Sequence, residues 1–173
     1  MRLHKPPLAL FLDRDGTLIV DEGYLSDPQQ VCLLPEVRET LAVLKSQGAL
    51  FFLHSNQSGV GRGYYTLKEA EACNQRMLDL LGLGNDLFTE VCLATGTPEN
   101  PCPYRKPSPR FILECIQKYH LDPEKCWMVG DRLCDVEAGL AAHINAICLD
   151  PKVEIPVEGH HCHSFGEILN LVR

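Results

Sequence analysis

The chain of 173 residues has a formal net charge of −7 and 45% hydrophobic residues, and this length suffices for one domain, which we expect to cover residues 1–173. The acidic charge argues against a nucleic-acid binder, which needs a basic surface. No apolar run approaches the roughly 20 residues that span a bilayer, and the start of the chain lacks the apolar core of a signal peptide, so we expect a cytoplasmic protein that does not bind membranes.

Short apolar runs alternate with amphipathic segments along the chain. The apolar runs predict strands that are covered on both faces, at residues 8–12, 49–54, 87–94, 126–129 and 146–149. The segments between and after them predict helices, at residues 36–47, 66–81, 109–119, 132–143 and 165–172. Because strands that alternate with helices form βαβ units around a mainly parallel sheet, we predict a doubly wound, Rossmann-like α/β fold.

Local signals mark several element ends. Thr66 and Glu69 have the spacing of a capping box, and Gly48 follows the first helix as a C-terminal stop. Ser108 predicts an N-cap, with Pro109 at the first helical position. Residues 23–35 could form a small flap but are too few for a second domain.

Most of the nine cysteines are expected to be reduced, because disulfides are rare in the cytosol. Those that lie in apolar patterns are expected to be small core residues: Cys32, Cys73, Cys115, Cys126, Cys134 and Cys148.

The end of the first strand carries the strongest chemical signal. Asp13 and Asp15 follow the apolar run, and residues two apart in extended chain face the same side. Crowded carboxylates need a cation or a shared proton, and Mg²⁺ with oxygen ligands meets that need beside phosphate. One Asp could attack phosphorus as a nucleophile, and the other could transfer the proton of the leaving group. Taken alone, this motif could also be an ordinary turn.

Polar residues follow the later strands in the same way. Residues 55–59 read Ser-Asn-Gln-Ser-Gly, which can present a hydroxyl, amides and backbone N–H groups to phosphate. Lys106, after Arg105, can neutralise both the phosphate and the nucleophile, and Asp131 can complete a magnesium site. Singly they could be a turn, a solvated lysine and a helix N-cap. Jointly they predict one site, because ligands of such folds bind at the carboxyl ends of the strands.

These motifs resemble those of the haloacid dehalogenase superfamily, over about residues 8–150. The matching positions are Asp13-Arg14-Asp15-Gly16-Thr17, Ser55-Asn56, Lys106, and Gly130-Asp131 with Asp135. Within the superfamily, residues 11–17, residues 55–59 with Arg62-Gly63, and residues 102–107 resemble the heptose bisphosphate phosphatases and the histidinol-phosphate phosphatases. The resemblance implies a Mg²⁺-dependent phosphatase with a minimal or absent cap domain.

The resemblance also implies a role for each matching residue. Asp13 would be the nucleophile and a metal ligand, Asp15 the general acid and base with its backbone carbonyl on the metal, and Asp131 the third protein ligand. The phosphoryl group would be held by Ser55, Asn56 and Lys106. The rest of the substrate would contact Arg105 and Arg62, with Gly23 and Tyr24 on a substrate-facing flap. Asp135 would either support the metal ligands without binding the metal, the interpretation that we prefer, or be an ordinary helix residue.

Many relatives hold a structural zinc with two Cys-containing pairs before the lysine, and here the sequence departs from them. Only Cys92 and Cys102 remain of the four ligands, and two thiolates do not complete a tetrahedral zinc site. We therefore predict no structural zinc. Residues 160–163, His-His-Cys-His, could bind a transition metal, but neighbours on a strand face opposite sides, so we interpret them as a final edge strand.

The sequence therefore predicts a phosphomonoesterase that acts through phospho-Asp13, with water activated by Asp15 in the second step. The leading substrate is a sugar phosphate, D-glycero-D-manno-heptose 1,7-bisphosphate, and histidinol phosphate is the first alternative. A phosphatase acting on nucleic acid is disfavoured by the acidic charge. A non-catalytic phospholigand-binding protein is the alternative of another class, and the presence of Asp15 argues against it. We expect a monomer or weak homo-oligomer whose partner is a small phosphorylated substrate.

Overall fold

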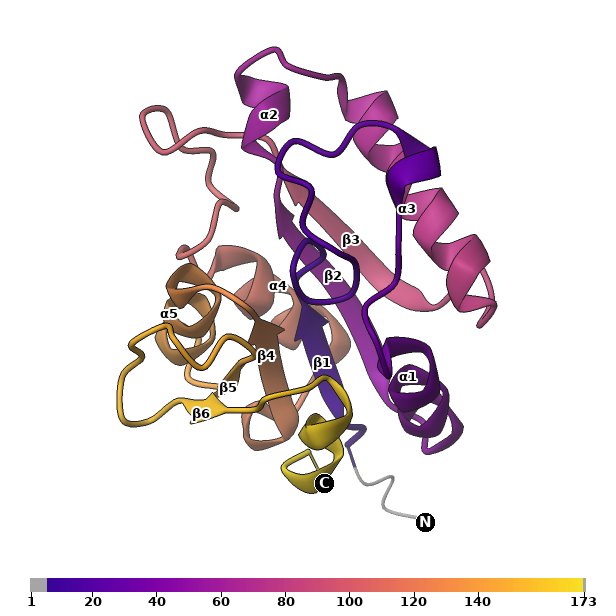
Figure 1. The fold of residues 1–173 in the computed structure, drawn as a ribbon. Helices are drawn as coiled ribbons and strands as arrows, with labels where there is room; N and C mark the ends of the chain where they lie inside the picture. Colours follow the sequence, from indigo (N-terminus) through magenta and orange to yellow (C-terminus); the bar gives the residue numbers. More distant parts are fainter. Residues whose placement is uncertain (1–5, 173) are drawn as a thin grey trace.

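The computed structural model describes residues 6–172, which contain a parallel sheet of six strands (Figure 1). The strand order is β3-β2-β1-β4-β5-β6, and every neighbouring pair is parallel. The strands are β1 (Ala9–Leu12), β2 (Leu50–Asn56), β3 (Phe88–Ala94), β4 (Cys126–Gly130), β5 (Asn145–Cys148) and β6 (His160–His161). Because this order reverses direction beside β1, it is that of a doubly wound sheet, and the predicted fold is confirmed.

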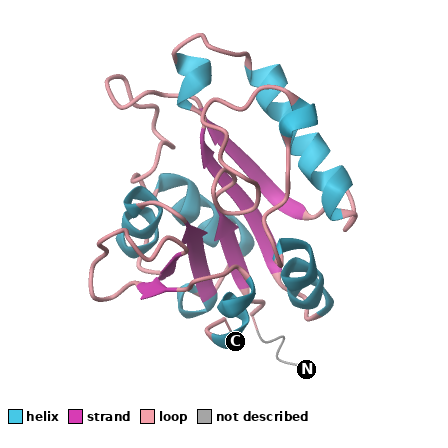
Figure 2. Cartoon of the chain, in the orientation of Figure 1, coloured by secondary structure: helices cyan, strands magenta, loops and turns pink. Residues whose placement is uncertain are grey.

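Helices cover both faces of the sheet (Figure 2). The main ones are α1 (Val37–Ser46), α3 (Leu67–Leu81), α4 (Arg110–Tyr119) and α5 (Leu133–Ala141). Along β1, Leu10 and Leu12 belong to the core that α1 and α3 cover, whereas Ala9 and Phe11 belong to the core that α4 and α5 cover. This alternation explains why β1 is apolar at every position, since neighbouring residues of a strand face opposite sides.

The local signals set most helix ends as predicted. Thr66 Oγ1 accepts a hydrogen bond from the Glu69 amide at 3.2 Å, and Glu69 Oε2 accepts one from the Thr66 amide at 2.7 Å. Gly48 follows α1 with a φ of 82°, a conformation that favours glycine. Helix α4 begins one residue later than predicted, with Pro109 at its N-cap. The hydroxyl of Ser108 instead donates to the carbonyl of Pro103 at 2.8 Å.

Four short elements differ from the prediction. Helix α2 (Ser58–Gly61) and the 3₁₀ helices η1 (Pro28–Gln30) and η2 (Pro123–Lys125) were not predicted. The last predicted helix is a 3₁₀ helix, η3 (Gly166–Asn170). Elements of three to five residues are too short to show a helical period in the sequence.

The segment between β1 and α1 crosses the carboxyl edge of the sheet as a loop (Figure 1). It contains η1 and an isolated bridge between Ile19 and Leu33. Cys32, on this segment, is exposed, so its predicted core position is wrong, and Cys134 is half-buried. Cys73, Cys115, Cys126 and Cys148 are buried as predicted. Within residues 6–172, no helix is both long and apolar enough to cross a membrane.

Candidate active site

A polar pocket of about 350 Å³ lies at the carboxyl ends of β1, β2 and β4. Its lining comes from segments far apart in the sequence and includes Asp13, Asp15, Gly23, Tyr24, Asn56, Gln57, Arg105, Lys106, Arg132 and Asp135. Most of the residues that the sequence singled out therefore meet here, at the edge where ligands of doubly wound sheets bind.

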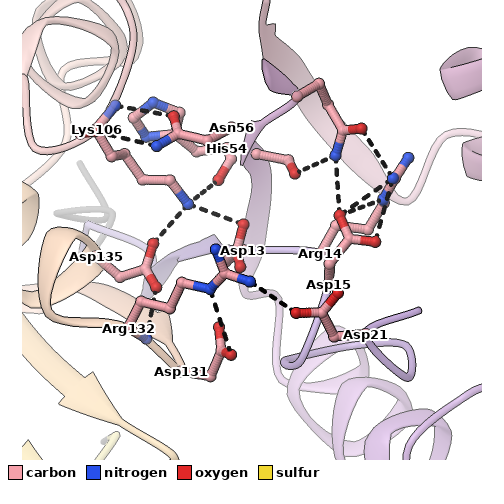
Figure 3. Close-up of polar contacts among 12 residues, drawn as sticks. Asp13, Arg14, Asp15, Asp21, His54, Asn56, Lys106, Asp131, Arg132 and Asp135 are labelled. Carbon is pink, nitrogen blue, oxygen red and sulfur yellow. Dashed lines mark hydrogen bonds and ion pairs between the residues drawn. The ribbon is translucent and has the colours of Figure 1, made fainter. Parts of the chain in front are cut away.

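Lys106 lies at the centre of the charged groups (Figure 3). Its Nζ donates to Asp13 Oδ1 at 2.9 Å and to the backbone carbonyl of His54 at 2.6 Å, and it lies 2.6 Å from Asp135 Oδ1. Burial alone would lower the pKa of Lys106, but the carboxylates of Asp13 and Asp135 outweigh burial and raise it. The ammonium therefore stays charged, and it places a fixed positive charge beside Asp13.

Three carboxylates gather around this lysine. One oxygen each of Asp13, Asp131 and Asp135 lies within 4.8 Å of the others, the one such group of possible metal ligands among residues 6–172. Asp131 Oδ1 is buried and has no hydrogen-bond partner. Burial, with the charges of Asp13 and Asp135, raises the pKa of Asp131 to about 7. A set of crowded carboxylate oxygens with an unused buried oxygen fits a hard divalent cation such as Mg²⁺.

Asp15 lies on the other side of the pocket, where neighbouring side chains bind its carboxyl group. Arg14 Nε and Nη2 donate to its two oxygens at 3.1 and 3.2 Å, and Gln57 Nε2 donates to Oδ2 at 2.9 Å. Burial raises the pKa of Asp15; the charge of Arg14 opposes this and that of Asp13 adds to it. A raised pKa suits a carboxyl group that must give up a proton during a reaction.

Asn56 is used differently from the prediction. Its Oδ1 accepts from the Lys106 amide at 2.9 Å, and its Nδ2 donates to the Lys106 carbonyl at 3.0 Å. Both polar ends of the side chain are therefore used to hold the backbone of Lys106 against the end of β2. Ser55 is also buried, and its Oγ accepts from Gln57 Nε2 at 2.8 Å.

The two arginines predicted to contact substrate lie in different places. Arg105 lines the pocket, and its Nη1 donates to the carbonyl of Gly96 at 3.0 Å. Arg62 does not line it, and its Nη2 lies 3.2 Å from both carboxylate oxygens of Glu99 on the exposed surface. The structure therefore brings Arg105 to the site but not Arg62.

Residues 20–143 match the family model of the haloacid dehalogenase-like hydrolases. The chain belongs to this family. It is 35% identical over 169 residues to the D-glycero-β-D-manno-heptose-1,7-bisphosphate 7-phosphatase of Helicobacter pylori, a match that covers 95% of this chain and 97% of that protein. It is 37% identical over 150 residues to the protein of the same name from Mesorhizobium japonicum, covering 82% of this chain and 69% of that protein.

A solved structure of D,D-heptose 1,7-bisphosphate phosphatase from B. bronchiseptica, complexed with magnesium and phosphate, has the same fold as this hydrolase. The TM-score is 0.85 at 22% identity, and the match covers 94% of this chain and 96% of that one.

Two residues of the hydrolase's pocket, Arg132 and Gln57, carried no separate signal in the sequence. Arg132 Nη2 lies 2.7 Å from Asp21 Oδ2 and so links the turn after β4 to the segment between β1 and α1. Tyr24, which was expected to face the substrate, lines the pocket and packs edge-on against Tyr64, with ring centroids 4.7 Å apart. Gln57 lay inside a turn that the sequence singled out as a group, but nothing local distinguished it from its neighbours.

The two remaining zinc positions of the hydrolase hold free thiols. Cys92 on β3 and Cys102 in the following loop are both half-buried, and burial raises the pKa of Cys92 to about 11. A thiol with a raised pKa is a poor metal ligand, because the thiolate is the form that binds. The absence of a structural zinc stays a prediction. His160 and His161 form the edge strand β6, as predicted.

Without a divalent cation, the hydrolase is expected to lose stability as the pH rises toward the raised pKa of Asp131. Its pKa lies at about 7 in the folded protein, above its ordinary value of 3.8. Between these values the folded protein binds more protons than the unfolded chain, so raising the pH favours unfolding. Mg²⁺ binds ionised carboxylates and should therefore stabilise the protein more at higher pH.

Thermal unfolding at about pH 5 and about pH 8, with chelator and with Mg²⁺, checks this expectation. Asp131→Asn should flatten the pH dependence in chelator and weaken the stabilisation by Mg²⁺. Equal stabilisation of the wild type and this variant would contradict a role for Asp131 in cation binding.

Proposed function

We propose that this hydrolase is a Mg²⁺-dependent phosphomonoesterase that removes the 7-phosphate of D-glycero-D-manno-heptose 1,7-bisphosphate. The observation that carries the proposal is the position of Asp13, which pairs with the charged Lys106 at 2.9 Å and lies in one cluster with the carboxylates of Asp131 and Asp135. The substrate is supported by the heptose bisphosphatases that match most of the chain. We expect the enzyme to act in the cytoplasm, and all nine of its cysteines are free thiols.

In the first chemical step, a carboxylate oxygen of Asp13 attacks phosphorus and the bond from phosphorus to the ester oxygen breaks. The proton of Asp15 passes to that leaving oxygen, so the products are the alcohol and phospho-Asp13. In the second step, Asp15 takes a proton from water as the water attacks phosphorus. This releases inorganic phosphate and restores both carboxyl groups.

Lys106 serves both steps, because its ammonium can contact the attacking carboxylate and neutralise phosphoryl oxygens as their charge changes. Asp13 and Asp131 are the residues that would hold Mg²⁺, together with the backbone carbonyl of Asp15. Bound Mg²⁺ would act as a Lewis acid toward a phosphoryl oxygen. Ser55 would donate its hydroxyl to the same phosphoryl group.

The remainder of the substrate would lie toward the rim of the pocket. Arg105 and Tyr24 both line the pocket and can contact a second phosphate and a sugar face, respectively. The pocket is small and polar, in keeping with a compact hydrophilic substrate.

The proposal is tested by phosphate release from a panel of phosphate esters, with Mg²⁺ and with chelator. The panel contains heptose 1,7-bisphosphate, other sugar bisphosphates, histidinol phosphate and nucleotides. We expect Mg²⁺-dependent release, with the highest kcat/KM for the heptose bisphosphate. Preference for histidinol phosphate would keep the mechanism and overturn the substrate. Mg²⁺ binding without release from any ester would favour a phospholigand-binding protein.

Arg105→Ala, assayed with the same panel, tests how the enzyme recognises the part of the substrate beyond the transferred phosphate. If Arg105 contacts the part of the substrate beyond the transferred phosphate, this variant should lower kcat/KM for the bisphosphate by roughly tenfold or more, the loss expected for one charge-assisted contact. It should change the hydrolysis of a small synthetic ester little. Arg62→Ala should affect neither ester, given its position on the surface beside Glu99.

A further inference from the structure

Arg14 is a buried charged residue that the proposed reaction does not use. Its side chain is 1% exposed. Besides its two bonds to Asp15, Nη2 donates to Gln57 Oε1 at 3.1 Å, and Nη1 donates to Asn74 Oδ1 at 2.9 Å and to the Ala70 carbonyl at 3.2 Å. With the two bonds to Asp15, five hydrogen bonds occupy the five N–H groups of the guanidinium. No donor is left for a substrate.

Gln57 connects this arginine to the end of β2. Its Oε1 accepts from Arg14 Nη2 and from the Tyr65 hydroxyl at 2.7 Å. Because a guanidinium can only donate, the carbonyl end of the amide must face Arg14, and the amide cannot be turned round. Its Nε2 then donates one hydrogen to Asp15 Oδ2 and the other to Ser55 Oγ.

This direction of donation has a consequence for Ser55. The oxygen of its hydroxyl accepts from Gln57, so its own hydrogen remains available to donate to another group. A phosphoryl oxygen accepts hydrogen bonds and cannot donate one once it is ionised. The amide of Gln57 thus leaves Ser55 in the orientation that an anionic substrate requires.

We propose that Arg14 and Gln57 are positioning residues, which hold the carboxyl group of Asp15 for proton transfer and keep the Ser55 hydroxyl as a donor toward phosphate. The inference rests on the proposed function, because it assigns proton transfer to Asp15 and phosphate binding to Ser55. Arg14 is suited to this work because its planar fork binds both carboxyl oxygens at once, whereas a lysine is a single point charge.

A purely structural role is the alternative, since Arg14 also links the turn after β1 to α3 through hydrogen bonds to Ala70 and Asn74. The two roles differ in how activity depends on the leaving group. A sugar or alkyl alcohol is a poor leaving group and needs the proton of Asp15, whereas 4-nitrophenolate leaves with little help. Loss of positioning should therefore lower kcat/KM, which reports the first step, selectively for alkyl esters. The second step, in which Asp15 activates water, is common to both esters and affects their kcat values alike. Loss of folded protein lowers both kcat/KM values equally.

The experiment measures kcat and KM for a sugar phosphate and for 4-nitrophenyl phosphate, at saturating Mg²⁺, in three variants. Arg14→Lys should lower kcat/KM about 100-fold on the sugar phosphate and less than about fivefold on the aryl ester, in line with the usual contribution of a general acid. Gln57→Glu keeps the shape of the side chain but removes both donated hydrogens, so it should also raise KM for both esters. Tyr65→Phe should have a smaller effect of the same kind.

Arg110→Gln is the matched control, because Arg110 is exposed and its guanidinium pairs with Glu114 and the Tyr104 ring, away from the pocket lining. It should leave both activities unchanged. Equal losses of kcat/KM on both esters in Arg14→Lys and Gln57→Glu would overturn the proposal. Replacing the buried guanidinium of Arg14 can impair folding. If Arg14→Lys folds poorly, the same comparison of the two esters in Gln57→Glu and Tyr65→Phe tests the proposal.

A second readout does not depend on turnover. In a ¹⁵N-labelled wild-type protein, the side-chain amide protons of Gln57 should exchange slowly with solvent, and their resonances should move in Asp15→Asn and in Arg14→Lys. Fast exchange, or chemical shifts that stay the same in both variants, would refute the hydrogen-bond arrangement. If the wild type hydrolyses no ester, the proposed function fails, and this measurement still decides the arrangement around Gln57.

Discussion

Asp13→Asn is expected to lower kcat by roughly 10⁴-fold or more while leaving the fold intact, because removing a covalent nucleophile leaves only the activity of the remaining site. The amide cannot form the acyl phosphate, but its oxygen can still accept the hydrogen bond from Lys106, 2.9 Å away in the wild type. The substitution also removes one negative charge from a crowded group of three carboxylates. Its thermal stability in chelator should therefore equal or exceed that of the wild type.

Steady-state kinetics and thermal unfolding of the same preparation test both halves of this expectation. Asp86→Asn is the matched control, because Asp86 is 90% exposed and pairs with the exposed end of Lys45 across 4.0 Å. Acid quenching during turnover, followed by mass spectrometry of the peptide that contains Asp13, should find a phosphoryl group in the wild type and none in the variant. Turnover that persists in Asp13→Asn would mean that another group attacks phosphorus.

The sequence predicts the position of Asp13 well, because the topology places it. An apolar run covered on both faces gives a parallel strand, and the carboxyl ends of parallel strands meet at one edge of the sheet. Asp131 follows β4 in the same way, which is why residues more than 100 positions apart could be assigned to one site. Periodicity predicted the succession of the longer strands and helices along the chain, and it missed or misassigned only helical elements of three to five residues.

The use of Asn56 could not be predicted in this way. Its position at the end of β2 suggests contact with phosphate, but its amide binds the backbone of Lys106, fifty residues further along the chain. Which way a side chain turns at a strand end depends on the partners that the fold brings to it. No local pattern encodes a loop fifty residues away.

The positions of Arg14 and Arg62 could not be predicted from the sequence either: Arg14 reaches the site although it was not expected to, and Arg62 does not reach it although it was. Arg14 lies between the two aspartates, and in a straight strand its side chain would face away from both. The turn after β1 instead brings its guanidinium to Asp15. Arg62 follows a motif closely in sequence, yet it ends α2 on the surface and pairs with Glu99. At both positions, closeness in sequence to a site motif did not predict where the side chain lies relative to the site.

Lys106→Met is expected to have the largest effect on stability. The ammonium compensates the carboxylates of Asp13 and Asp135, whose side chains are only 9% and 1% exposed. Methionine fills a similar volume but leaves two buried charges without a partner, and breaking a buried ion pair from one side costs about 3–5 kcal/mol. The same substitution should lower kcat by roughly 100-fold or more, because it removes a fixed charge beside the transferring phosphate.

Denaturant unfolding of three proteins separates these effects. Lys106→Met should be the least stable, and Lys106→Met with Asp135→Asn should recover part of the loss, because the second change removes one of the uncompensated charges. Lys118→Met is the matched control: Lys118 pairs with Glu90 but is 64% exposed, and exposed pairs contribute about 1 kcal/mol or less. If Lys106→Met were no less stable than this control, the carboxylates would not need the lysine. The charge of Lys106 would then serve the reaction alone, and only kcat would fall.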